Sequence, residues 1–356
     1  MNINSSLLSS TLDIRAFTNR STNNFKRLIS VVLLATTLSC GDGGSDNEPD
    51  KLKIAVIPKG TTHVFWQFVH AGAIKAASEF DVNIVWVGPE KEDDRQQQIA
   101  LVDNQVINDV SGIVLAPLDD KALRRPVEAA AKHGIPVVIF DSSLEDADAF
   151  TVSFVATDNL TGGRLAGVNL GKILNGKGKV IMLRFTEGSA STEKREKGFL
   201  EAITQFPDIE VVSHEQYGGA TTALALQASE NLLLRFKGED GQLTVDGIFC
   251  PNESTTFGML QALRRNRLAG KVGFVGFDSS EPLIEGLNAG EIDGLVVQNP
   301  FKMGYISVKT MFNHLKGQTV DKLVDTGVTF VSKANVTQPE IVDLVSPDLE
   351  KWLGRK

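Results

Sequence analysis

The segment that decides the fold is Lys53-Ile54-Ala55-Val56-Ile57-Pro58-Lys59-Gly60-Thr61-Thr62-His63-Val64-Phe65-Trp66-Gln67-Phe68-Val69. Its unbroken apolar run, residues 54–57, predicts a strand buried on both faces, which is typical of parallel α/β sheets. The segment after it predicts a loop and then a helix, with apolar residues spaced for one buried face. Ligands of open α/β sheets bind beyond the carboxyl ends of the strands, where this loop lies. The loop carries four side chains suited to binding: Lys59, His63, Phe65 and Trp66.

Strand and helix patterns alternate along the rest of the chain. Apolar runs of strand length recur as far as residues 295–297, and amphipathic segments such as 165–174 and 223–235 separate most of them. This order predicts parallel sheets with helices on both faces. About ten strands are more than one such sheet usually contains. We therefore predict an α/β fold of two doubly wound lobes.

The composition excludes several classes of protein. The formal net charge of −8 gives no sign of a nucleic-acid partner, which usually requires a basic patch. The chain has two cysteines, which argues against a disulfide framework, and Cys250 at the end of a predicted strand is expected to be a buried core thiol. Glycine-rich nucleotide turns, a phosphate loop, a Gly-x-Ser-x-Gly elbow and metal-ligand spacing are all missing from the sequence. We expect no enzyme activity, no cofactor and no metal.

The N-terminus predicts export. Lys26-Arg27 precedes an apolar run, residues 28–38, that is too short to span a bilayer. This arrangement predicts a signal peptide over residues 1–39. Residues 40–50 are rich in glycine and acids and predict a flexible tether.

The end of this signal resembles a bacterial lipoprotein box. Leu38-Ser39-Cys40 supplies the cysteine, although Thr37 stands where the box usually has leucine. The resemblance implies that Cys40 is lipidated, and a plain secretory signal with an incidental cysteine is the alternative. We expect a protein of the periplasm or cell envelope with a lipid anchor in a membrane.

Polar side chains follow the strands of both predicted lobes. One carboxylate after a strand is usually a turn former or a helix cap. Six polar segments at the ends of predicted strands in both lobes favour a binding cleft instead. They are Pro58-Lys59, Asp141-Ser142, Glu187-Gly188-Ser189, Asn252-Glu253, Asp278 and Gln298-Asn299.

Together these segments resemble the sugar-binding branch of the type I periplasmic binding proteins, the ribose-binding proteins and their relatives. The resemblance covers about residues 51–335. Besides the first segment, it depends on residues 134–141, 156–163, 188–199, 250–253, 275–278 and 298–300. It implies two lobes joined by a hinge of three crossings, near residues 157–158, 298–299 and 325–327. The expected first lobe is 51–157 plus 299–325, and the second is 158–298 plus 326–356.

The resemblance also implies the binding roles of individual residues. Phe65 and Trp66 take the positions that stack on a sugar ring, and His63 stands where a hydroxyl-binding asparagine is common. Four more match hydroxyl-binding positions: Asp141, Asn252, Asp278 and Gln298. These residue types suit a sugar, which offers C–H faces to aromatic rings and many hydroxyls to carboxylates and amides.

Three departures from the family pattern concern charge. Ser142 follows Asp141 where the family has arginine, Glu193 replaces a second arginine, and Lys59 replaces a small polar residue. We include all three in the predicted site, although Glu193 could simply cap a helix. The altered charge leaves a polyol, a modified sugar, a cationic ligand or a furanosyl signalling molecule open.

We expect other roles for the remaining charged residues. Arg195 is expected to be a structural ion-pair partner, and Asp119-Asp120 and Glu92-Asp93-Asp94 are expected to be solvated loop charges. A later aromatic residue of the family's cleft is replaced near Gly218-Gly219, unless Tyr217 substitutes for it.

The predicted function is capture of a carbohydrate between two lobes by hinge closure, followed by delivery to an ABC-type permease. We expect a monomer. Presentation of the ligand to a chemoreceptor or sensor kinase is the alternative output. A carbohydrate-active enzyme is a weaker alternative, and the N-terminal export signal argues against a transcription regulator, which would need a DNA-binding segment there.

Overall fold

The structure, a computed structural model, describes residues 51–354. The predicted signal peptide (1–39), the tether (40–50) and the Cys40 lipidation site lie outside the described residues. None of the described helices combines the length and apolar character that a membrane-spanning helix needs.

The first lobe is built on a six-stranded sheet with the strand order β11-β5-β4-β3-β1-β2, in which all paired neighbours are parallel. Its strands are β1 (Lys53–Ile57), β2 (Asn83–Trp86), β3 (Gly112–Leu115), β4 (Val137–Phe140), β5 (Ser153–Ala156) and β11 (Leu323–Asp325). Its helices are α1 (Val64–Phe80), α2 (Arg95–Ile107), α3 (Arg124–Lys132) and α9 (Pro300–Leu315).

Alternate residues of β1 face opposite cores of this lobe. Ile54 and Val56 pack with residues of α1 and α9, whereas Ala55 and Ile57 pack with residues of α2 and α3. All four side chains are fully buried. The apolar run therefore forms the doubly covered strand that the sequence predicts.

The second lobe repeats this architecture with the strand order β12-β10-β9-β8-β6-β7. Its strands are β6 (Lys177–Met182), β7 (Asp208–Ser213), β8 (Gly247–Phe249), β9 (Gly273–Phe277), β10 (Gly294–Gln298) and β12 (Val328–Val331), the last of which is antiparallel to β10. Helices α4 (Asn159–Ile173) and α5 (Ala190–Ile203) contribute to the core on one face. Helices α6 (Thr222–Arg235), α7 (Glu253–Arg265) and α8 (Glu281–Ala289) contribute to the core on the other.

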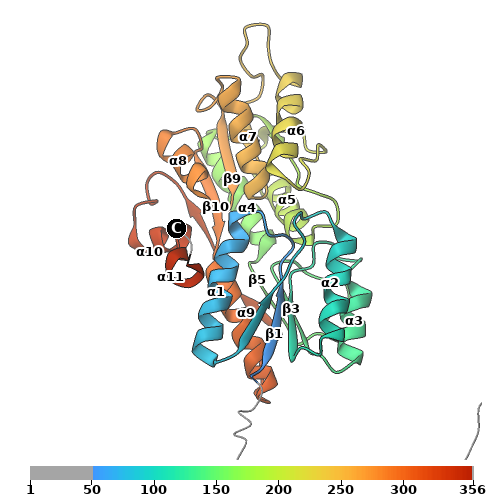
Figure 1. Ribbon diagram of the computed structural model, residues 1–356. Helices are drawn as coiled ribbons and strands as arrows, with labels where there is room; N and C mark the ends of the chain where they lie inside the picture. Colours follow the sequence, from blue (N-terminus) through green and yellow to red (C-terminus); the bar gives the residue numbers. More distant parts are fainter. Residues whose placement is uncertain (1–50, 355–356) are drawn as a thin grey trace, which may run out of the picture. The chain divides into compact units, whose positions relative to one another are not determined.

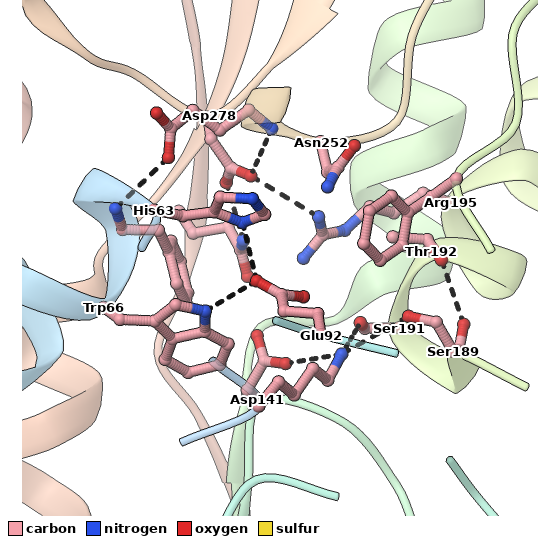
Figure 2. Close-up of a pocket in the computed structure, with 15 residues that line it drawn as sticks. His63, Trp66, Glu92, Asp141, Ser189, Ser191, Thr192, Arg195, Asn252 and Asp278 are labelled. Carbon is pink, nitrogen blue, oxygen red and sulfur yellow. Dashed lines mark hydrogen bonds and ion pairs between the residues drawn. The ribbon is translucent and has the colours of Figure 1, made fainter. Parts of the chain in front are cut away.

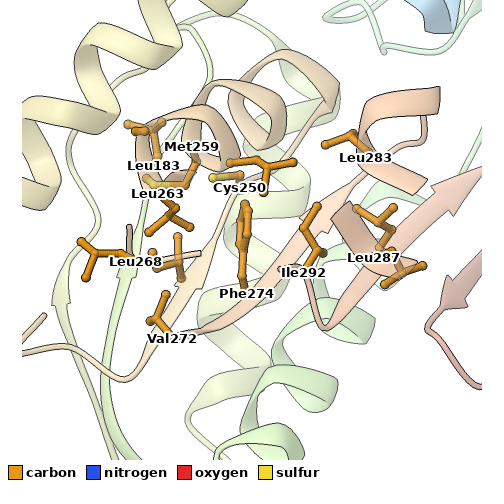
Figure 3. Packing of buried hydrophobic residues seen from close by; sticks show 14 of the residues in the cluster. Leu183, Cys250, Met259, Leu263, Leu268, Val272, Phe274, Leu283, Leu287 and Ile292 are labelled. Atoms are coloured by element: carbon orange, nitrogen blue, oxygen red, sulfur yellow. The ribbon is translucent and has the colours of Figure 1, made fainter. Parts of the chain in front are cut away.

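Cys250 lies within the core under α7 and α8 (Figure 3). Its side chain is fully buried, and burial raises the pKa of its thiol well above the ordinary value. The prediction of a buried core thiol is confirmed.

Within residues 51–354 the chain passes between the two sheets three times, as predicted. The passages are residues 157–158 between β5 and α4, Asn299 between β10 and α9, and residues 326–327 between β11 and β12. Asp158 and Asn299 cap the helices that follow, by accepting from the backbone N–H groups of Thr161 and Lys302. Each passage is therefore short and ends in a capped helix or a strand.

The end of the described chain contacts both lobes. Ile341 and Val345 of α10 (Pro339–Val345) join the core of the second lobe. Helix α11 (Leu349–Leu353) lies against α1 of the first lobe, and the Trp352 ring lies 6.3 Å from the Phe301 ring of α9. The sequence predicts that residues 326–356 belong to the second lobe alone, but helix α11 also contacts the first lobe.

Helices α1 and α9 pack side by side with their backbones in contact (Figure 1). A β-carbon at Gly72 would lie 1.9 Å from the carbonyl oxygen of Phe301, and one at Gly304 would lie 2.0 Å from that of Val69. Only glycine allows this approach. The crossing fixes α1, whose first turn carries Phe65 and Trp66.

Candidate functional site

The candidate site is a small cavity between the two sheets, lined by residues of both lobes (Figure 2). Its volume is about 30 Å³, which is room for little more than water. Eight of the ten predicted site residues line it: Lys59, His63, Phe65, Trp66, Asp141, Asn252, Asp278 and Gln298. The parallel sheets explain this convergence, because the carboxyl ends of their strands meet at one edge of each lobe.

Lys59 is a buried cation rather than a solvated one. Its ammonium lies 2.9 Å from the Asp141 carboxylate and donates to Ser191 Oγ of the second lobe at 2.8 Å and to Ser189 Oγ at 3.4 Å. Asp141 follows β4 with φ 60°, a left-handed conformation that aspartate tolerates better than most residues. Lys59 therefore links an acid of its own lobe to hydroxyls of the other.

Glu92 was expected to be a solvated loop charge, and that expectation is wrong. Its carboxylate is buried and accepts from His63 Nδ1 at 2.6 Å and from Trp66 Nε1 at 2.7 Å (Figure 2). Burial opposes the charge of Glu92, but the charge and hydrogen bond of His63 outweigh it, so the pKa of Glu92 lies below its ordinary value. Burial likewise opposes the charge of His63, and Glu92 raises the pKa of His63 to about 9. The two therefore form a buried ion pair at neutral pH.

Asp278 organises the second lobe's side of the cavity. It follows β9 with φ 66° and accepts from Gln298 Nε2 at 2.7 Å and from the Glu253 backbone N–H at 3.2 Å. Arg195 lies 3.7 Å from the Asp278 carboxylate and donates to Asn159 Oδ1 at 2.7 Å. Arg195 is thus the ion-pair partner that the sequence predicts, but it also lines the cavity.

Glu253 begins α7 and reaches across to the first lobe. Its carboxylate accepts from the Phe65 backbone N–H at 3.4 Å. Burial raises the pKa of Glu253 to about 7, even though the His63 charge acts to lower it. In the sequence this residue resembles an ordinary first-turn acid, and only its position opposite α1 distinguishes it.

Three aromatic rings line the cavity. Phe65 and Trp66 meet edge to face, with ring centroids 4.9 Å apart and planes at 89°. Phe185, which follows β6, is the third and was missed from the sequence. Tyr217 does not line the cavity, so it does not substitute there for the family's later cleft aromatic. Its ring lies under the guanidinium of Arg184 instead.

Two of the predicted residues do not line the cavity. Ser142 Oγ accepts from the Ser191 backbone N–H at 3.1 Å, which is another contact between the lobes. Glu193 accepts from the Gly188 backbone N–H at 2.9 Å at the start of α5. Glu193 therefore makes a contact at the end of helix α5, in keeping with the alternative of a helix-capping acid.

Two buried polar atoms of the cavity have no hydrogen-bond partner among the described residues. They are His63 Nε2 and Gln298 Oε1. Such atoms are costly to bury unless something pairs with them. In residues 51–354, no group of His, Cys, Asp and Glu side chains could hold a metal ion.

Comparison with protein families gives one match over most of the chain. A model described as a periplasmic binding protein domain matches residues 54–319. The chain is 26% identical to the ribose import binding protein of Haemophilus influenzae over 306 residues, which covers 86% of this chain and 98% of that protein. It is 29% identical to the D-allose-binding periplasmic protein of Escherichia coli, covering 75% of this chain and 85% of that protein.

Solved structures agree with this match. A solute binding protein from Agrobacterium radiobacter in complex with D-arabinose is 34% identical, with a TM-score of 0.78 over 83% of this chain and 99% of that chain. One from Agrobacterium vitis with bound D-fucose is also 34% identical, with a TM-score of 0.78 over 82% of this chain and 99% of that chain.

Proposed function

Because this chain belongs to the periplasmic binding protein domain family, we propose that it captures a neutral monosaccharide between its two lobes and delivers it to an ABC-type permease. The observation that carries the proposal is the composition of the cavity. Aromatic rings of the first lobe face carboxylate, amide and guanidinium groups of the second. The names of similar proteins point the same way, since they bind ribose, allose, arabinose or fucose.

The charges in the cavity favour a neutral ligand. The cations Lys59, His63 and Arg195 oppose the acids Glu92, Asp141 and Asp278. Glu253 adds a fourth carboxyl group whose pKa is about 7. The residues that line the cavity therefore have no excess of positive charge with which to bind the carboxylate of an acidic sugar.

In this proposal Phe65 and Trp66 contact the C–H faces of the sugar ring. Polar side chains of both lobes bind the hydroxyls: His63 and Asp141 from the first, and Asn252, Asp278 and Gln298 from the second. Lys59 and Ser142 of the first lobe both hydrogen-bond Ser191 of the second lobe, and so hold the closed lobes together. We assign Glu193 a helix-end role and no ligand contact.

Binding requires the lobes to move. A cavity of about 30 Å³ is far smaller than the roughly 300 Å³ or more of typical ligand sites. We therefore propose that the lobes separate at the three passages to admit the sugar and close around it again. A micromolar complex requires about −8 kcal/mol, which ring contacts and several charge-assisted hydrogen bonds can supply.

A thermal-unfolding screen tests the function. The probes are D-ribose, D-allose, D-arabinose, D-fucose and D-tagatose, with D-glucuronate as the acidic comparison. A ligand that binds only the folded protein raises the unfolding midpoint by mass action. We expect a saturable rise with at least one neutral sugar and none with D-glucuronate. A rise with D-glucuronate alone would contradict the neutral-ligand proposal.

For the segment before residue 51 we propose export, lipidation of Cys40 and a monomeric protein tethered to a membrane. Support comes from the sequence alone: the basic flank, the short apolar run and the acidic tether. Cys40→Ser should leave export intact and move the protein from the membrane fraction to the soluble fraction. Export without any change in membrane association would contradict lipidation.

A further inference from the structure

Glu92 holds two rings of the first lobe with a single carboxylate oxygen. Oε1 accepts from His63 Nδ1 at 2.6 Å and from Trp66 Nε1 at 2.7 Å. Glu92, His63 and Trp66 are 7%, 8% and 3% exposed, so water does not compete for these bonds. The loop after β2 thus fixes the orientation of two side chains that begin α1.

The bond to Glu92 determines what the other imidazole nitrogen can do. Because Nδ1 donates to Glu92, only Nε2 of His63 is left to face the cavity, where it has no described partner. Burial lowers the pKa of His63, but Glu92, Glu253 and Asp278 together raise it to about 9. Below that pH, Nε2 carries a proton and can only donate.

We propose that Glu92 is a positioning residue for ligand binding, which orients His63 so that its Nε2–H donates to a hydroxyl oxygen of the bound sugar. The inference rests on the proposed sugar-binding function. The carboxyl groups of Glu253 and Asp278 of the second lobe line the same cavity as His63, and either can accept a hydrogen bond from that hydroxyl. One sugar hydroxyl would then join the two lobes, so the proposal requires the bound sugar to present a free hydroxyl to His63.

Calorimetric titration of the full mature protein with the sugar that binds best in the panel provides the first test. Glu92→Gln and His63→Phe should weaken binding by about 10- to 100-fold, the usual effect of losing a hydrogen bond to a charged group. Glu90→Gln is the matched control, since Glu90 is an exposed acid of the same loop, and it should leave affinity within about twofold. Wild-type affinity in Glu92→Gln would overturn the proposal.

Nitrogen NMR of the imidazole rings separates positioning from a purely structural role. The chain has five histidines, and the spectrum of His63→Phe assigns the His63 signals. In the wild type we expect a protonated Nε2 at pH 7.5 whose signal shifts when the sugar is added. In Glu92→Gln the pKa of His63 should fall, and that proton should be lost at a lower pH.

The outcomes are distinguishable. If a sugar binds but the His63 Nε2 signal does not shift, Glu92 and His63 only support Trp66 and the inference fails while the proposed function stands. If no sugar in the panel binds, the proposed function fails and this inference fails with it.

Discussion

The ion pair between Lys59 and Asp141 is the clearest buried charge of the first lobe, since both side chains are almost wholly inaccessible. Removing one partner of a buried pair leaves the other without compensation. Lys59→Met should therefore destabilise the protein by about 3 kcal/mol or more. Urea unfolding measures this, with Lys53→Met as the control because Lys53 is exposed. Equal midpoints for the two variants would show that Lys59 is not buried in solution.

Glu253 should make stability depend on pH. Its pKa rises from 4.5 to about 7 on folding, so between those values the folded protein binds more protons than the unfolded chain. The stabilisation from the neutral carboxyl is present below pH 4.5 and is lost as pH rises toward 7, by about 3 kcal/mol. Glu253→Gln should gain stability relative to the wild type over this window. The free energy of unfolding in urea is measured against pH for both proteins. If it changes with pH in the same way in both, Glu253 is not the group responsible.

At the scale of single residues, position in the fold was enough to predict that certain side chains lie together at the cavity. Lys59, Asp141 and Asp278 follow buried strands and Gln298 ends one, and parallel strands bring such residues to one edge. The burial of Glu92 could not be predicted in this way, because Glu92 belongs to an acidic run, Glu92-Asp93-Asp94, whose members look alike in sequence. Only the packing of α1 beneath the loop separates the buried acid from its exposed neighbours.

At the scale of elements, the crossing of α1 and α9 holds the first turn of α1 in place. A β-carbon at Gly72 would lie 1.9 Å from a backbone oxygen, so the helices would have to move apart. Gly72→Ala should destabilise the protein by about 1–3 kcal/mol, as overpacking does. Ser78→Ala, an exposed change on the same helix, should be close to neutral. Thermal unfolding measures the stability of both variants. If Gly72→Ala is as stable as Ser78→Ala, the close packing of α1 against α9 is contradicted.

The elements missed from the sequence were those without a buried apolar run. Strands β11 and β12 are edge strands, and most of their side chains are exposed or half-buried. Buried strands such as β1 and β4 were readily identified because all or nearly all of their residues face a core. Strands β11 and β12 carry no such signal, because Val331 is the one residue in them that is buried.

At the scale of the whole described chain, residues 339–353 form a fourth link between the lobes. Helix α10 is anchored in the second lobe by Ile341 and Val345, whereas α11 has no buried residue and contacts the first lobe through Trp352. We expect α11 to release first when the lobes separate. Trp352→Ala should therefore disfavour the closed form and weaken sugar binding by less than tenfold. Trp352→Phe, which keeps a ring, should bind normally, and equal affinities for both variants would contradict the link.

The proposed function requires that one monosaccharide binds between the lobes and contacts both. Calorimetric titration of the wild type, Asp141→Ala and Asp278→Ala with the sugar that binds best tests it most directly, because each variant removes an acid from a different lobe. Asp103→Ala, an exposed change on α2, is the control. We predict one sugar per chain, unchanged affinity in the control and at least a tenfold loss in each of the other variants. Full affinity in either Asp141→Ala or Asp278→Ala would place the sugar on one lobe alone and contradict the account.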